Sequence, residues 1–312
     1  MDLNVLAHLQ DQSKNKEEIF QFVMRAHKFL RKIELGGTDN NTKKKAIPFV
    51  WACNGLSAGI ATEIGLACHH RIAADIKNTK IGLPEILVGL FPGAGGATRV
   101  SRMLGLMASA PILMEGKMFS AKKAKTIGLI NEVSSPLDLI EDAKKWILNA
   151  TKEDITKPWD KKGFKMPGGA PYHPNGFMTF VGASAMISSK TKNLYPAAKY
   201  LLSAIYEGAL TNFDNALRIE ARWFTKILTE KSTKNMIRTL FINKTALEKG
   251  IKRPSVDSKE IKFNKIGVDK NPKKLISNVK KLKRYGWKPK TDFNLALKKY
   301  VDWYKSFYID GN

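Results

Sequence analysis

The sequence predicts an α/β fold, and three observations indicate it. A short apolar segment, 46–53, ends at the turn signal Asn54–Gly55 and leads into an apolar run rich in small residues, 58–68. That order predicts a strand, a turn and the start of a buried helix. Further strand-like and helix-like segments follow to about residue 150, and helical patterns then continue to about residue 253. A mixed fold with a helical extension follows from this order.

The first elements are an amphipathic helix, a polar loop and a buried strand. Apolar residues recur at steps of three and four over 17–33, which predicts the helix. His27 lies on or beside its apolar face without a partner four residues away, so we interpret it as a packed or surface histidine. The polar stretch 36–45 predicts a solvated loop. The strand expected over 46–53 carries Pro48 near its start, where a missing backbone donor does least harm.

Two glutamates stand beside glycine-rich backbone in the region that follows. Glu63 lies in the opening turns of the buried helix, where free amides and the helix dipole can hold an oxygen that gains negative charge. Glu85 follows Gly82-Leu83-Pro84, and the proline predicts a sharp, exposed corner. Two carboxylates on one apolar scaffold can share general acid and general base work. We therefore predict Glu63 and Glu85 as a catalytic pair.

The segments around this pair complete the predicted core. Strands are expected at 71–75 and 80–82, and His69 and His70 are expected to be cations at a helix C-terminus. The glycine-rich run 91–96 is neither G-x-G-x-x-G nor a Walker sequence, so we expect it to let a helix start close to the Glu85 corner. Arg99 and Arg102 on that helix either meet anionic groups or face water.

The second half of the chain is mainly helical. The stretch 157–176 is rich in proline, glycine and aromatic residues and predicts a long ordered loop leading away from the core. The remaining predicted helices are 120–127, capped by Ser120 and ended by Gly128, then 136–150, 195–210 and 213–228.

Composition narrows the class of protein. At 312 residues with 43% hydrophobic content, the chain can bury a substantial core. Its net charge of +25 invites a nucleic-acid interpretation, but no nucleic-acid-binding signature accompanies the charge. We favour lysines spread over solvated surfaces, and a basic surface would also attract the phosphates of coenzyme A.

Targeting signals and cysteines agree with a reducing compartment. Cys53 and Cys68 lie in apolar segments and form neither a C-x-x-C pair nor a disulfide framework. The N-terminal residues lack the pattern of a signal peptide, and no apolar run reaches membrane-spanning length. We expect a soluble cytoplasmic protein that does not bind membranes.

Several motifs together resemble the enoyl-CoA hydratase, or crotonase, family. They are N-G-x-x-x-G-x-x-x-E over 54–63, the corner G-L-P-E-I-x-x-G-L-x-P-G-A-G-G over 82–96, and Glu115-Gly116-Lys117, Ser120-Ala121 and Gly128-Leu129-Ile130. The sequence is most similar to the hydratase part of the multifunctional fatty-acid oxidation alpha subunit, which also carries a 3-hydroxyacyl-CoA dehydrogenase. Runs at 157–160, 166–169 and 195–199 resemble its linker, so the resemblance covers roughly residues 1–252.

The resemblance implies a fold and a division into domains. Residues 1–150 would form a crotonase-like ββα spiral lacking its first strands, and residues 151–253 the helical linker region. Residues 254–312, with Gly286-Trp287-Lys288-Pro289, resemble the C-terminal end of a GDP-fucose synthase or nucleotide-sugar epimerase and would be a short α-helical tail. The Tyr195…Lys199 spacing fits a dehydrogenase dyad but also the linker, and we assign it no catalytic role.

The resemblance also implies a reaction, the syn hydration of 2-enoyl-CoA in fatty-acid β-oxidation. Glu63 would orient and deprotonate a water, and Glu85 would exchange a proton at the α-carbon. The oxyanion donors would be the backbone nitrogens of Ile60 and Met1, and Gly59 is the one glycine kept from the family's pattern of three. Because the chain begins inside the motif of the first donor, we expect an N-terminal truncation that impairs this oxyanion hole.

The implied partners follow from the same family. The substrate would be a coenzyme A thioester, with no metal, no separate cofactor and no NAD site, because no G-x-G-x-x-G sequence occurs. A homo-oligomer or association with a thiolase subunit is possible for such a chain. The alternative function is a catalytically inactive acyl-CoA-binding or assembly remnant of a β-oxidation protein.

Overall fold

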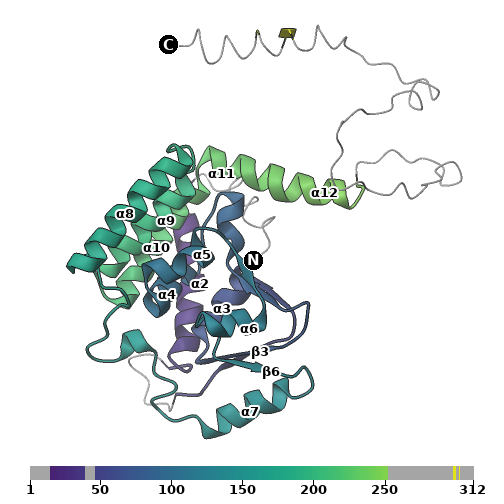
Figure 1. Ribbon diagram of the computed structural model, residues 1–312, viewed down its shortest axis with the longest axis vertical. Coiled ribbons are helices and arrows are strands. Elements are labelled where there is room, and N and C mark those ends of the chain that lie inside the picture. Colours follow the sequence, from purple (N-terminus) through teal and green to yellow (C-terminus); the bar gives the residue numbers. More distant parts are fainter. Residues whose placement is uncertain (1–14, 39–45, 252–297, 300–301, 303–312) are drawn as a thin grey trace, which may run out of the picture. The chain divides into compact units, whose positions relative to one another are not determined.

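The computed structural model describes residues 15–38, 46–251, 298–299 and 302. The chain separates into two compact units, Met1–Arg253 and Pro254–Asn312. In the second unit the described residues Lys298, Lys299 and Asp302 are helical and exposed. The fold and the site described below lie in the first unit (Figure 1).

The elements of the first unit follow one another in a mixed order of helices and strands. Its first part contains α2 Lys16–Glu34, β1 Val50–Cys53, β2 Leu56–Ala58, α3 Ile60–Ala67, β3 His70–Ala74, β4 Lys80–Gly82, the 3₁₀ helix η1 Pro84–Val88, α4 Gly96–Leu104, α5 Leu106–Leu113, β5 Met118–Phe119, α6 Ala121–Thr126, β6 Glu132–Ser134 and α7 Leu139–Asn149. Its second part contains the 3₁₀ helix η2 Pro158–Asp160, α8 Pro174–Thr191, α9 Pro196–Ala209, α10 Phe213–Leu228, α11 Lys231–Met236, the π-helical segment η3 Ile237–Asn243 and α12 Lys244–Glu248.

Local sequence explains the ends of several helices. The side chain of Asn15 accepts a hydrogen bond from the Glu17 amide and caps α2. Ser120 caps α6 by accepting from the Lys123 amide, as predicted. The helices predicted at 195–210 and 213–228 are α9 and α10, almost residue for residue.

The strands form two small sheets. In one, β1, β3 and β6 run parallel, with Val50 opposite His70 and Ile72 opposite Glu132. In the other, β2 runs parallel to β4, and β5 pairs antiparallel with β4. Helix α7 packs on β1 and β3 (Figure 1). The predicted α/β fold with a helical extension is therefore confirmed.

The helices of the second part pack against the sheet-bearing part. Helix α10 packs against α9, α2 and α4, and α8 lies beside α9 (Figure 1). The ring of Phe224 on α10 meets Phe91 edge to face, with centroids 5.7 Å apart. The largest cluster of buried apolar residues includes side chains from both parts. Burial of this shared apolar area stabilises the two parts together.

Three local expectations were wrong. The strand expected over 46–53 begins only at Val50 and is only partly buried. The loop expected to lead away from the core returns to it, because Lys157 is buried and its Nζ donates to the Leu66 and Cys68 carbonyls, 2.9 and 2.6 Å away. This amino group, whose pKa burial lowers to about 7, satisfies carbonyls at the end of α3 that have no intrahelical partner.

The third correction concerns the histidine pair. His70 opens strand β3 and is not at a helix end. His69 is buried, its Nδ1 accepts from the Phe49 amide, and its Nε2 donates to the Glu34 carbonyl. Burial, the largest cause, and the nearby Lys157 charge lower the pKa of His69, so it is a neutral structural group and not a cation.

Candidate active site

Glycine 59 turns the chain from β2 into α3 and so places Glu63. Its φ of 61° lies in the left-handed region that favours glycine. Its carbonyl then accepts from the Thr62 and Glu63 amides and starts the helix. Glu63 comes one turn later, with 2% of its surface exposed.

The side chain of Glu63 is held by the start of α4. Its Oε1 accepts from the Ala94 and Gly96 amides, both at 2.8 Å. A Cβ on Gly96 would lie 2.8 Å from the same oxygen, so glycine is required for this approach. The glycine-rich run was expected to serve the Glu85 corner, but its amides bind Glu63. Among the described residues, Glu63 Oε2 has no hydrogen-bond partner and is left for a ligand.

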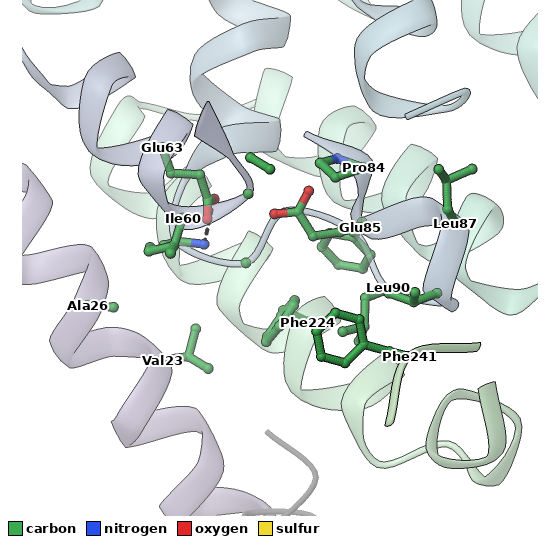
Figure 2. A pocket seen from close by; sticks show the side chains of 16 residues that line it. Val23, Ala26, Ile60, Glu63, Pro84, Glu85, Leu87, Leu90, Phe224 and Phe241 are labelled. Atoms are coloured by element: carbon green, nitrogen blue, oxygen red, sulfur yellow. Dashed lines mark hydrogen bonds between the residues drawn. The ribbon is translucent and has the colours of Figure 1, made fainter. Parts of the chain in front are cut away.

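Glu85 lies on η1 and faces Glu63 across the cavity (Figure 2). Its Oε1 would be 2.9 Å from a Cβ added to Gly59, which brings the two elements into close contact. Its Oε2 is buried and has no hydrogen-bond partner among the described residues. The expectation of an exposed corner was therefore wrong for Glu85, which is only partly exposed and borders the cavity.

The two carboxyl groups differ in their environments. Burial, and then the negative charge of Glu63, raise the pKa of Glu85 to about 8. Burial, the largest cause, raises the pKa of Glu63 above its ordinary value, although the Ala94 and Gly96 amides and the Arg99 charge oppose this rise. Glu63 therefore differs from Glu85 in having donors that favour its ionised form, whereas Glu85, with a pKa of about 8, is a protonated acid at neutral pH.

A cavity of about 340 Å³ lies between α2, η1 and the helical part of the chain (Figure 2). Both glutamates border it, and its other walls are mostly apolar. The wall residues are Val23, Ala26, Ala58, Gly59, Ile60, Pro84, Leu87, Val88, Leu90, Phe91, Gly93, Ala94, Phe224 and Phe241. Such a cavity suits a small apolar group beside two proton-carrying side chains.

The residues expected at the oxyanion hole differ in whether their backbone amides are free to bind a ligand. Ile60 is the first residue of α3 and borders the cavity, so its amide lacks an intrahelical partner and can donate to a ligand. The Gly59 amide instead donates to the Gly82 carbonyl at 3.1 Å. Met1 lies outside the described residues.

Tyr195 fixes the segment that carries Glu85. Its hydroxyl donates to the Ile86 carbonyl and accepts from the Gly89 amide at 3.1 Å. Thr233 Oγ1 donates to the Gly89 carbonyl at 2.9 Å. Tyr195 therefore helps to position the segment that carries Glu85. In the sequence, its only notable feature was the Tyr195…Lys199 spacing, to which we assigned no catalytic role.

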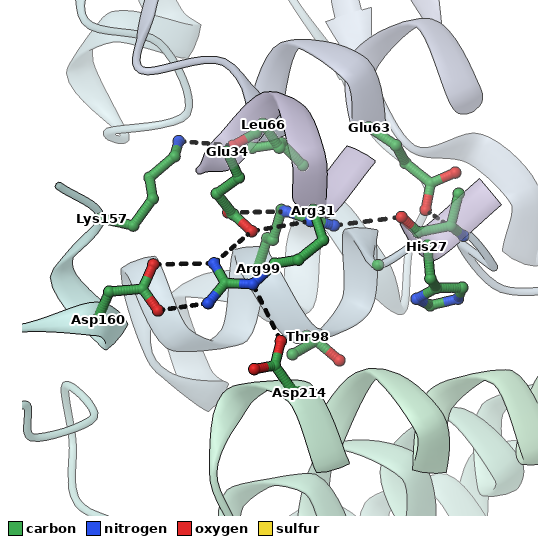
Figure 3. Close-up of polar contacts among 12 residues, drawn as sticks. His27, Arg31, Glu34, Glu63, Leu66, Thr98, Arg99, Lys157, Asp160 and Asp214 are labelled. Atoms are coloured by element: carbon green, nitrogen blue, oxygen red, sulfur yellow. Dashed lines mark hydrogen bonds and ion pairs between the residues drawn. The ribbon is translucent and has the colours of Figure 1, made fainter. Parts of the chain in front are cut away.

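An ion-pair network lies behind the site (Figure 3). Arg99 is fully buried and its Nε and Nη2 donate to the two oxygens of Glu34, each at 3.1 Å. Arg31 binds both Glu34 and Asp160 and so ties α2 to η2. Arg99 thus meets an anionic side chain, one of the two expected alternatives, and its charge also acts on Glu63.

Glu220 is a buried polar residue that the sequence interpretation missed. It lies on α10 with no exposed surface. The signal was available, because Glu220 falls within the apolar stripe formed by Ala216, Leu217, Ala221 and Phe224. A glutamate inside such a stripe must be paired or protonated, and its distant partners could not be read from the sequence.

The described residues contain no group of histidine, cysteine, aspartate or glutamate side chains that could hold a metal ion. No helix among them is both long enough and apolar enough to cross a membrane.

The site lies within a stretch that matches a known family. Residues 38–157 match the model of the enoyl-CoA hydratase/isomerase family, and both glutamates, Gly59 and Ile60 fall inside the match. This match supports the family that the sequence motifs predicted for this stretch.

Similar proteins extend the comparison. The chain is 30% identical over 221 residues to the fatty acid oxidation complex subunit alpha of Vibrio parahaemolyticus, covering 71% of this chain and 30% of that protein. It is also 30% identical over 223 residues to the subunit of the same name from Shewanella loihica, covering 72% and 31%. The chain thus spans about 30% of the length of these curated relatives.

Solved structures of enoyl-CoA hydratases are also similar. That from Mycobacterium avium subsp. paratuberculosis has a TM-score of 0.44 at 18% identity and covers 71% of each chain. That from Bacillus anthracis has a TM-score of 0.37 at 22% identity and covers 76% of this chain and 69% of its own. The comparisons give no support to the epimerase-like tail expected over 254–312, most of which lies outside the described residues.

Proposed function

We propose that the chain catalyses the syn hydration of a 2-enoyl-CoA thioester. The observation that supports this most directly is the pair of carboxyl groups on one apolar cavity. Two amides donate to Glu63 and favour its ionised form, whereas Glu85, with a pKa of about 8, is protonated at neutral pH. One base and one acid are what the addition of water to a conjugated double bond requires.

The steps of the reaction follow from the positions of these groups. The Ile60 amide polarises the thioester carbonyl, so negative charge can develop on its oxygen. Glu63 Oε2 takes a proton from a water whose oxygen bonds to the β-carbon, and Glu85 gives its proton to the α-carbon. For the addition to be syn, both carboxyls must act on one face of the double bond. Glu63 then passes its proton to solvent and Glu85 regains one, which leaves a net addition of one water.

The proposal requires no metal and no separate cofactor, because the coenzyme A belongs to the substrate. The same cavity also fits a second function, the binding of an acyl-CoA without turnover. Ile60 favours that alternative, because its side chain stands where the family pattern has glycine and it borders the cavity. A bulkier side chain there narrows the space for the thioester.

The test is an assay of crotonyl-CoA hydration by the purified full chain, monitored as the loss of the enoyl-thioester absorbance. Glu63→Gln and Glu85→Gln should each lose activity by about a hundredfold or more, the usual contribution of a positioned acid or base. Glu132→Gln is the matched control, because Glu132 binds His70 and does not border the cavity.

The outcomes separate the two functions. No turnover above background, together with calorimetric binding of crotonyl-CoA, would replace hydration by acyl-CoA binding. If the protein shows no turnover and does not bind crotonyl-CoA, both functions are refuted.

A further inference from the structure

The start of α4 is held by a second carboxylate besides Glu63. Glu220 Oε1 accepts from the Gly95 amide at 2.6 Å. Its Oε2 accepts from the Thr98 amide and from Thr98 Oγ1, both at 2.7 Å. These are amides that the helix itself cannot satisfy.

The two glutamates share one turn of backbone in alternation. Glu63 takes the Ala94 and Gly96 amides, and Glu220 takes those of Gly95 and Thr98. Since neighbouring amides bind different carboxylates, the turn cannot rotate toward one without losing the other. The position of Glu63 Oε1 therefore depends on a residue of the helical part, 157 positions further along the chain.

The charges around Glu220 are few. His27 Nε2 lies 4.0 Å from its Oε1 but donates to the Gly93 carbonyl at 2.8 Å. Burial, chiefly, lowers the pKa of His27 to about 3, so this ring is neutral and does not balance Glu220. Arg99 is engaged by Glu34. The group that faces Glu220 electrostatically is Glu63, whose charge, after burial, raises the pKa of Glu220 to about 7.

We propose that Glu220 is a positioning residue for the base: it holds the first turn of α4, which in turn holds Glu63 Oε1 and leaves Oε2 free for water. Glutamine cannot replace it, because its NH₂ group would face the Gly95 or Thr98 amide, donor against donor. The inference rests on the proposed hydration only for its kinetic part.

The test measures Glu63 directly as well as turnover. Full-length protein labelled with ¹³C at the glutamate carboxyls is titrated by NMR, and the Glu63 signal is assigned by its loss in Glu63→Gln. In Glu220→Gln the midpoint of Glu63 should rise, because the displaced turn withdraws the Ala94 and Gly96 amides that favour the ionised form of Glu63; a fall would show that only the charge of Glu220 acts on it. In the same variant kcat should fall about tenfold or more with KM nearly unchanged, since the base is displaced.

Glu230→Gln is the matched control, because Glu230 binds the Tyr200 hydroxyl and makes no contact with α4. Thr98→Val is a milder variant that removes one hydrogen bond to Glu220 and no charge. It should move the Glu63 midpoint in the same direction by less, and Thr98→Ser should restore it.

The Glu63 midpoint tests the positioning role even if the protein shows no turnover. A folded Glu220→Gln protein with the wild-type Glu63 midpoint would overturn the inference. If that variant does not fold, identical midpoints in Thr98→Val and Thr98→Ser would overturn it. If the wild type shows no turnover but the midpoint moves as stated, the positioning role stands and the proposed hydration fails.

Discussion

Replacing Glu85 by glutamine should remove the activity. It should also make the protein more stable relative to the wild type as the pH rises. In the unfolded chain Glu85 ionises near the ordinary glutamate pKa of 4.5, whereas the folded protein holds the pKa at about 8. Between these values the folded state binds more protons, so the Glu85 contribution to the free energy of unfolding falls as pH increases. Glutamine carries no charge at any pH and removes this dependence.

The size of the effect follows from the two pKa values. Between pH 5 and pH 8 the wild type should lose about 3 kcal/mol of stability through this group. The figure is an upper bound, because Glu85 borders the cavity and water there lowers the cost of ionisation. Any penalty from the amide of the new glutamine is the same at each pH and cancels from the slope.

Urea unfolding of both proteins at pH 5, 6.5 and 8 measures this directly. The stability of Glu85→Gln relative to the wild type should rise steadily across the series. Glu132→Gln, altered at an exposed carboxyl, controls for the loss of one negative charge. A relative stability of Glu85→Gln that stays flat with pH would show that Glu85 is ionised in the folded state, and the assignment of the acid would be wrong.

Three further predictions concern the support of the pair. Gly59→Ala should reduce kcat/KM by about a hundredfold, because its Cβ would press on Glu85 Oε1 and its φ would be strained; an active variant would contradict this close packing. Tyr195→Phe should lower the melting temperature and shift the pH optimum, because η1 loses the hydrogen bonds of the tyrosine hydroxyl at a cost of about 1–3 kcal/mol. Unchanged calorimetric and pH profiles would count against this prediction. Arg99→Met should destabilise the protein by about 3–5 kcal/mol, because the buried Glu34 loses its bidentate partner and keeps only Arg31. Adding Glu34→Leu should recover part of that loss in denaturant titrations, and additive losses would disprove the pairing.

The sequence was sufficient for the parts of the site that are local in the chain. Glu63 and Glu85 could be identified because each follows a short glycine- or proline-containing turn, and such turns determine direction within a few residues. The direction of the Glu85 corner could not be inferred, because it depends on Tyr195 and Thr233 more than a hundred residues away. The glycine run was recognised as a helix start, but which carboxylate it binds depends on the packing of α3 against α4.

Buried charges were the hardest feature to infer, because each needs a partner from another element. Arg99 and Glu34 are 65 positions apart, and neither has a local pattern that names the other. The same holds for Lys157, which begins the stretch that was expected to lead away from the core, whereas it closes the end of α3. Composition describes a segment, but burial of a charge is decided by tertiary neighbours.

The three buried glutamates differ in the hydrogen-bond donors that each one meets. Glu63 and Glu220 accept hydrogen bonds from the start of α4, and those donors oppose the rise in pKa that burial causes. Glu85 has a buried oxygen without such a donor and faces the charge of Glu63, so its neutral form is favoured. The amides at the start of α4 bind Glu63 and Glu220 but not Glu85. Adding one hydrogen-bond donor beside Glu85 would therefore lower the pKa of Glu85 and remove the proton donor from the site. The orphaned oxygen of Glu85 is therefore the feature on which the division between acid and base depends.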